Sequence, residues 1–491
     1  MNECFSVVCL NMFASGVLRA GCVGFVLGTG VGLFFLWSTG GALVFLSLTI
    51  AVSTIWFPRY AGVALVCCGI FFGAWWHSAE RLSWWRLLPD SESTLFRAEV
   101  VREPIRKEQS RQVTLRPIAC SNECPDNLVL GSFPTFSDIS FGDIVALSCP
   151  LERPKSFTPD VDFPLILAKD GIGYVCRFPR EWRIEGESAH TAFSWLHAVR
   201  ARFERGIEAA LPEPESGLVA GLLIGGDDRL PERIRERFSR AGISHIVAVS
   251  GYNVSIVATL LMAILIFFGL YRQTAFWGAL LGILCFMLLV GAPASAVRAS
   301  IMAGTALLAM RLGRLGNAGA AVLFSASGML LANPLLLRYD IGFQLSFAAT
   351  IGILFLAPLA LLSLRMGDIM ATTIAAELFV FPLLLFHFHT LPTFSLVANV
   401  FVLPLVPFAM LFGFVAAIFG MVVPSLAFIV GFPAFLVSHT ILALAEFFSR
   451  WTFSAIPVPN FGMGALLSSY LVLFLFIVYS SRKRLSRIFS V

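Results

Sequence analysis

The sequence predicts a polytopic α-helical membrane protein with a small inserted all-β domain, OB-like, on its extracytoplasmic side. Of the 491 residues, 57% are hydrophobic and 13% are charged, and the mean hydropathy is +0.83; an average soluble domain has roughly 25% charged residues. The charges are unevenly distributed, because 47 of the 65 Asp, Glu, Lys and Arg residues lie between positions 79 and 240, and 11 lie between 241 and 481. This pattern excludes an ordinary soluble enzyme, a fibrous protein and a disordered chain.

Composition divides the chain into five regions. They are N-terminal transmembrane helices (1–78), the OB-like domain (79–190), interfacial amphipathic and basic helices (191–241), a second transmembrane domain (242–481) and a basic tail (482–491). The first region holds three apolar stretches of near-membrane length, at 21–37, 41–57 and 61–77. Arg19 and Arg59 flank them, and the positive-inside rule places both arginines in the cytoplasm, so that the polar domain lies outside.

Within the polar domain the pattern changes to short runs with strand character, separated by turn-forming pairs such as Ser121-Asn122. The predicted strands are 95–101, 112–118, 127–133, 143–148 and 171–178. Five short strands in succession favour a small barrel, and an OB-type five-stranded barrel is one candidate.

Four of the ten cysteines lie in this domain, and they are Cys120, Cys124, Cys149 and Cys176. An even number of cysteines in a domain that faces the periplasm or the exterior can form one or two disulfides. They form no CxxC pair, and the chain has no HExxH motif or carboxylate-rich cluster. We therefore expect no metal site and no other cofactor.

Two helices are predicted between the polar domain and the second transmembrane domain. Residues 191–211 have the amphipathic pattern of a helix that lies in the membrane interface. In the second helix, arginines recur at intervals of four, four and three residues on one face, and they are Arg229, Arg233, Arg237 and Arg240. A row of guanidinium groups suits nucleic-acid phosphates, and it equally suits anionic lipid headgroups.

From residue 243 onward the chain is almost continuously apolar, so its few polar residues are informative. The predicted spans are about 243–270, 275–290, 294–312, 318–336, 342–364 and 370–388, with three or four more up to 479. The polar residues within them are His245, Ser250, Asn253, Arg298, Asp340, Gln344, Glu377 and Asn399. For the first three, hydrogen bonding between helices is the structural alternative to a function. Arg298 has the alternative role of a structural partner for Asp340 or Glu377.

The sequence predicts no enzyme. Ser250 lacks the G-x-S-x-G elbow of a serine hydrolase. None of the four lysines follows a glycine, so that no Walker A loop exists. A membrane enzyme that uses His245 and Ser250 is the least favoured hypothesis.

Four motifs resemble those of the ComEC family of competence proteins. They are GLLIG (221–225) followed by FSRAGISHIVAVSG (238–251), then SAVRA (295–299), GFQLSF (342–347), and Ala398-Asn399-Val400 followed by Pro404. The polar insert is similar to the extracytoplasmic OB-like domain of that family. Many members carry a histidine where this chain has Asn253, and longer members append a metallo-β-lactamase-like domain. The resemblance implies a short form without that domain.

The resemblance further implies a multi-pass channel in the bacterial inner membrane that passes single-stranded DNA into the cytoplasm during natural transformation. Region 242–481 is then the competence-type channel domain. His245, Ser250, Asn253, Arg298 and Gln344, with the four arginines of the basic helix, are expected to contact the DNA or line its conduit. Asp340, Glu377 and Asn399 are expected to be structural or gating residues.

The partners that this function implies are single-stranded DNA, membrane lipids, a periplasmic or surface DNA receptor, a cytoplasmic helicase or motor, and a separate nuclease. An alternative function from another class is a transporter or flippase for a different anionic substrate, such as a lipid-linked or nucleotide-like molecule.

Overall fold

The computed structural model describes residues 22–30, 73, 75–77, 95–106, 110–120, 124–156, 162–179, 181–187, 194–226, 229–247, 251–311, 318–364, 368–451 and 453–488. The chain forms two compact units: residues 1–194 with 320–340, and residues 195–319 with 341–491. The three predicted N-terminal spans lie outside the described residues, except that 22–30, 73 and 75–77 are helical.

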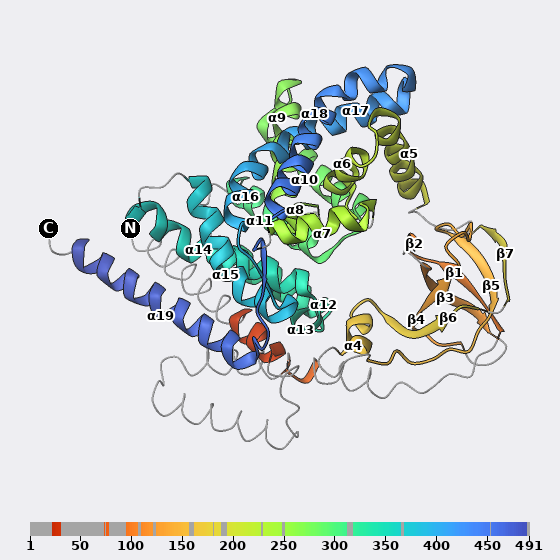
Figure 1. Ribbon diagram of the computed structural model, residues 1–491, viewed down its shortest axis with the longest axis horizontal. Coiled ribbons are helices and arrows are strands. Elements are labelled where there is room, and N and C mark those ends of the chain that lie inside the picture. Colours follow the sequence, from red (N-terminus) through yellow and green to blue (C-terminus); the bar gives the residue numbers. More distant parts are fainter. Residues whose placement is uncertain are drawn as a thin grey trace, which may run out of the picture. The chain divides into compact units, whose positions relative to one another are not determined.

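A mixed β-sheet is the main feature of the first unit (Figure 1). Its strands are β1 (Leu95–Val100), β2 (Ile105–Arg106), β3 (Arg111–Cys120), β4 (Leu128–Phe133), β5 (Asp143–Ser148), β6 (Ile172–Arg177) and β7 (Glu181–Glu187). The strand order is β6-β4-β3-β1-β5-β7, and β2 pairs with β3. The β4–β6 pair is parallel, and the other pairs are antiparallel.

The alternation of buried and partly exposed residues along β4 and β5 fits a sheet with one face on a core. That core includes Phe96, Leu115 and Phe133, each at most 1% exposed. The five predicted strands are confirmed to within two residues at each end. The sequence interpretation missed the two-residue strand β2, strand β7 and the short helix α4 (Phe163–Ala168).

The sheet closes between β5 and β6. The chain just after β5 forms a bridge with β6, in which the Glu152 N–H donates to the Val175 carbonyl over 3.0 Å, and the Val175 N–H donates to the Glu152 carbonyl over 2.8 Å. A disulfide between Cys149 and Cys176 joins the same two segments, and a second disulfide joins Cys120 to Cys124. All four cysteines of the domain are therefore oxidised.

The second unit is helical (Figure 1). Its helices are α5 (Ser194–Ala210), α6 (Glu215–Ile224), α7 (Glu232–Ala241), α8 (Ser244–Val247), α9 (Gly251–Phe267), α10 (Arg272–Leu289), α11 (Ala294–Arg311), α14 (Ile341–Leu364), α15 (Asp368–Phe388), α16 (Ser395–Val402), η3 (Leu403–Leu405), α17 (Val406–Val422), α18 (Pro424–Ser449) and α19 (Met463–Ile488). A two-stranded sheet joins β8 (Thr390–Pro392) to β9 (Ala455–Pro457). Helices α12 (Ala318–Ala332) and α13 (Leu336–Tyr339) fall almost entirely in the first unit.

Six helical stretches in the described part of the chain are long and apolar enough to cross a membrane. They are Arg272–Leu289, Ile341–Leu359, Met370–Phe388, Ser395–Val422, Pro424–Ser449 and Met463–Ser480. The protein is therefore a multi-pass membrane protein. Of the predicted span 243–270, the structure describes α8 (Ser244–Val247) and α9 (Gly251–Phe267), and residues 248–250 between them lie outside the described part.

Helix α6 lies at the centre of the packing in the second unit. All ten of its residues are buried, and its apolar side chains from Leu218 to Ile224 belong with residues of α5, α17 and α18 to one apolar core. Glycines permit the close approach of these helices, because a Cβ atom at Gly206 of α5 or at Gly420 of α17 would overlap the backbone of the other helix. The apolar face of the predicted amphipathic helix, which includes Phe203 and Ile207, packs into this core.

Candidate functional site

The first candidate site surrounds Arg298 of α11, whose side chain is buried among apolar helices and is 7% exposed. Its Nη1 donates to the Ser346 carbonyl over 2.5 Å and to the Thr350 hydroxyl, both on α14. The guanidinium also lies 5.4 Å from the centre of the Phe347 ring. These contacts offset part of the cost of burying a charge. The partner of Arg298 is thus α14, and neither Asp340 nor Glu377 takes the alternative role that the sequence left open.

Gly251 brings a third helix to Arg298. A Cβ atom at this first residue of α9 would lie 3.2 Å from Arg298 Nη2, so that any larger residue would crowd the guanidinium. The Ser-Gly, SAVRA and GFQLSF motifs therefore meet at one side chain, although Ser250 itself lies outside the described residues. Arg298 Nε is buried without a hydrogen-bond partner within the described part of the chain.

The second polar cluster surrounds Glu377 of α15. Its Oε1 accepts hydrogen bonds from Asn399 Nδ2 over 2.6 Å and from Ser395 Oγ over 3.0 Å, both on α16. The Gly242 carbonyl at the end of α7 lies 3.1 Å from the same Ser395 hydroxyl. Because a hydroxyl carries one hydrogen, Gly242 and Glu377 compete for one donor. This cluster connects the first motif to the fourth.

The backbone conformation of Gly242 makes this contact possible. Gly242 has a φ of +76°, in the left-handed region that glycine adopts without strain. A Cβ atom there would lie 2.5 Å from Ser395 Cβ and 2.8 Å from Pro392 Cβ. The glycine therefore ends α7 and also allows α16 to approach.

The other predicted polar residues lie in four separate places. Asn253 of α9 is 1% exposed, and its Nδ2 donates to the Leu222 carbonyl of α6 over 3.1 Å. Gln344 Oε1 lies 2.7 Å from His387 Nε2, which links α14 to α15. His245 is exposed on α8.

Asp340 belongs to the first unit. It forms an ion pair with Lys169 over 2.6 Å, and the Asn333 amide donates to the Lys169 carbonyl over 2.7 Å. Around these polar contacts, Leu165 of α4 packs with Tyr339 of α13. Asp340 thus attaches the segment after α4 to α13.

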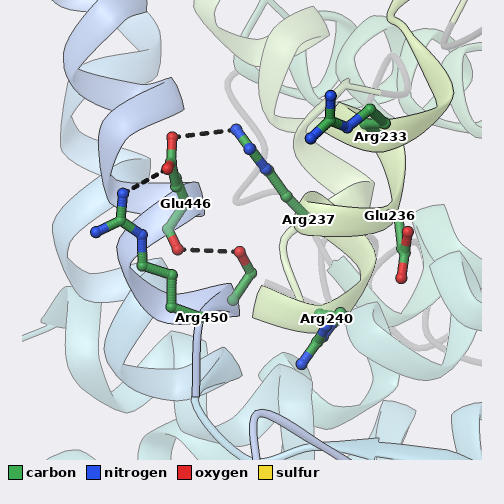
Figure 2. Close-up of a pocket in the computed structure, with 7 residues that line it drawn as sticks. Arg233, Glu236, Arg237, Arg240, Glu446 and Arg450 are labelled. Atoms are coloured by element: carbon green, nitrogen blue, oxygen red, sulfur yellow. Dashed lines mark hydrogen bonds and ion pairs between the residues drawn. The ribbon is translucent and has the colours of Figure 1, made fainter. Parts of the chain in front are cut away.

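The third candidate site is an open basic pocket between α7 and α18, with a volume of about 330 Å³. The residues that line it are Arg233, Glu236, Arg237, Arg240, Glu446, Ser449 and Arg450. Figure 2 shows Arg237 and Arg450 approaching the Glu446 carboxylate from opposite sides, with N–O distances of 3.0 and 2.5 Å. Four guanidinium groups against two carboxylates leave the pocket positively charged.

Arg229 does not share this pocket. It precedes α7, which begins at Glu232, and it forms an ion pair with Glu204 of α5 over 2.5 Å. The basic face of α7 therefore consists of three of the four predicted arginines.

The sequence interpretation missed Glu446 and Arg450. They occupy the end of an apolar stretch, where charged residues are usually read as the boundary of a membrane span. Their four-residue separation was the available signal, because it places an acid and a base on the same face of a helix. Among the described residues there is no group of three or more side chains that could hold a metal ion.

Comparisons with known proteins concern the region that holds these sites. A family model described as Competence protein matches residues 222–483. The ComE operon protein 3 of Bacillus subtilis (strain 168) is 29% identical to the chain over 209 residues, which are 42% of this chain and 27% of that protein. The chain thus aligns with well under half of the length of this relative. No solved structure matches. The residues matched by the family model include both polar clusters and the basic pocket.

Proposed function

The chain belongs to the Competence protein family, and from this premise we propose that it forms a channel that passes single-stranded DNA into the cytoplasm during natural transformation. The membrane is then the bacterial inner membrane. The proposal agrees with a protein that crosses the membrane several times and that holds an open arginine-lined pocket.

The buried guanidinium of Arg298 is the observation that carries the proposal. A charge inside a bundle of apolar helices is costly, and such residues usually serve a pathway for a polar substrate. Arg298 meets residues of three motifs, on α9, α11 and α14, and its Nε has no partner among the described residues. An unused N–H donor at the point where three helices meet suits an anionic chain that passes between them.

The proposal assigns the remaining tasks to other molecules. A periplasmic or surface receptor delivers the DNA, a separate nuclease produces the single strand, and a cytoplasmic helicase or motor draws it inward. The chain itself performs no catalytic step in this scheme. Membrane lipids surround its apolar helices.

The test measures entry of labelled DNA into the cytoplasm of the source bacterium. Deletion of the gene should abolish uptake, and the intact gene should restore it. Arg298→Ala, present at normal levels in the membrane, should reduce uptake at least ten-fold. Arg272→Ala is the matched control, because this arginine is exposed at the start of α10. Unchanged uptake in the deletion strain would refute the channel.

The alternative is a transporter or flippase for another anionic substrate, which the positive charge of the basic pocket would also suit. Under that alternative the deletion strain would take up DNA normally, while the transport of a smaller anion would be lost.

A further inference from the structure

We infer that the basic pocket between α7 and α18 binds the phosphodiester backbone of DNA, and that the Glu446 carboxylate occupies it as an internal anion that a DNA phosphate displaces. The inference rests on the proposed function, because it assigns the entry point of the channel. It adds Arg450 and Trp451 to the residues that contact DNA, and it makes Glu446 the anion that the DNA displaces.

The arrangement of charges supports an exchange of anions. Glu446 is the shared acceptor of Arg237 and Arg450, and its carboxylate lies between the two guanidinium groups (Figure 2). A phosphate presents oxygens to guanidinium groups as a carboxylate does, with more charge to share. Arg233 makes no hydrogen bond or ion pair within the described residues, and it is exposed. The pocket thus holds one unpaired arginine and two that are held by a replaceable anion.

The spacing of the arginines favours a polymer over a single phosphate. Arg233, Arg237 and Arg240 occupy one face of α7, at intervals of four and three residues. With a rise of about 1.5 Å per residue, the outer two are about 10 Å apart along the helix. One phosphate cannot contact all three guanidinium groups, whereas successive phosphates of a strand can.

Exposed aromatic rings beside the pocket favour DNA over a lipid headgroup. Arg240 Nη2 lies 3.4 Å from the Trp451 carbonyl. The rings of Trp451 and Phe453 are 5.8 Å apart and are 48% and 53% exposed. Unpaired bases stack on such rings, while neighbouring arginines hold the backbone. A phospholipid headgroup offers no flat base to stack.

The position of the pocket along the chain places it on the receiving side of the membrane. Helices α18 and α19 are consecutive membrane spans, and the basic sequence SRKRLSR (481–487) lies at the end of α19. The positive-inside rule places that end in the cytoplasm, so that the end of α18 and its pocket face outward. The positive-inside rule disfavours a group of arginines on the outer side. An anionic ligand that arrives from outside explains their presence there.

The experiment uses the full chain in nanodiscs of neutral phosphatidylcholine and a fluorescent 20-nucleotide oligo-dT as the probe. Fluorescence anisotropy gives the Kd at several salt concentrations. Glu446→Gln should lower the Kd at least three-fold and steepen the plot of log K against log[salt] by about 0.7 for each guanidinium released. Glu232→Gln is the matched control, since it removes an equal charge from α7 at a carboxylate that pairs with Arg235 outside the pocket.

If Glu446→Gln alters folding, two other variants test the pocket, and one of them has a matched control. Arg233→Gln should weaken binding at least three-fold, whereas Arg235→Gln should not. Trp451→Ala should weaken binding roughly five-fold or more, as expected for the loss of one stacked base. Size-exclusion chromatography and thermal unfolding confirm that each variant is folded.

Three outcomes would overturn the inference. The first is an equal effect of Glu446→Gln and Glu232→Gln on the Kd, which would show that only the overall charge of the protein matters. The second is an equal effect of Arg233→Gln and Arg235→Gln. The third is a pocket that binds phosphatidylglycerol in nanodiscs while oligo-dT binding is unaffected by every substitution. Because this assay measures binding and the deletion assay measures uptake, the pocket and the channel can fail independently.

Discussion

The buried polar clusters and the basic pocket hold arginines in opposite ways. Arg298 is engaged by the facing helix α14 and by an aromatic ring, and it is almost inaccessible to solvent. Arg233 is exposed and makes no polar contact within the described residues, while Arg237 and Arg450 share one replaceable carboxylate. The environment, and not the residue type, decides how many of an arginine's hydrogen-bond donors the protein itself engages.

Replacement of Arg298 should have the largest effect on stability. Arg298→Ala removes two hydrogen bonds and the contact with Phe347, and we expect a loss of about 3 kcal/mol in the free energy of unfolding. Arg298→Lys keeps the charge but cannot fork between two acceptors, so that its loss should be smaller. Thermal unfolding in detergent measures both. Full stability of Arg298→Ala would show that the residue is not a tie between helices, which would break the comparison.

Gly242→Ala should rank second, with a loss of about 2 kcal/mol. The added Cβ is strained by the positive φ and collides with Ser395 and Pro392. Gly464→Ala is the control, because a Cβ atom at Gly464 meets nothing within 4 Å and its φ is not in the left-handed region. The same unfolding assay applies. Equal stability of the two variants would mean that α7 and α16 need not approach closely.

Substitutions of Glu377 should have a smaller effect. Glu377→Leu leaves the Ser395 hydroxyl and the Asn399 amide without their shared acceptor, and we expect a loss of about 1.5 kcal/mol. Glu377→Gln keeps a carbonyl oxygen in place, so that less than about half of that loss should follow. A loss as large for Gln as for Leu would show that the charge of Glu377 matters, and not only its role as acceptor.

Arg233→Gln should leave stability within about 0.5 kcal/mol of the original protein, because an exposed side chain without a partner contributes little. Its effect should appear in the binding of oligo-dT instead. Arg233→Gln should thus change binding without changing stability, whereas Arg298→Ala should lower stability. A large loss of stability in Arg233→Gln would erase the difference between the two regions.

Much of the fold could be predicted from the sequence, because apolar runs and alternation report burial directly. The five predicted strands follow a clear pattern of that kind. Strand β7 was missed because its sequence, EWRIEGE, contains three glutamates and one glycine, which are depleted in strands. The alternation of Trp182 and Ile184 was the remaining signal.

The sequence singled out several polar residues of the candidate sites, but it predicted neither their pairings nor Glu446 and Arg450. The sequence singled out Arg298, Glu377 and Asn399 because polar groups in apolar spans are costly. Their partners come from other helices, such as Thr350 for Arg298, and no local pattern encodes such pairings. The ion pair of Lys169 with Asp340 spans 171 positions and gave no signal at all.

Strand β7 has a consequence for the newly synthesised chain during folding. It ends the strand order of the sheet, and within the described residues its outer edge pairs with no further strand. Glu181, Arg183 and Glu185 are exposed along it, and an incoming strand would have to strip water from these charges. These charges therefore oppose aggregation through this edge while the newly synthesised domain folds.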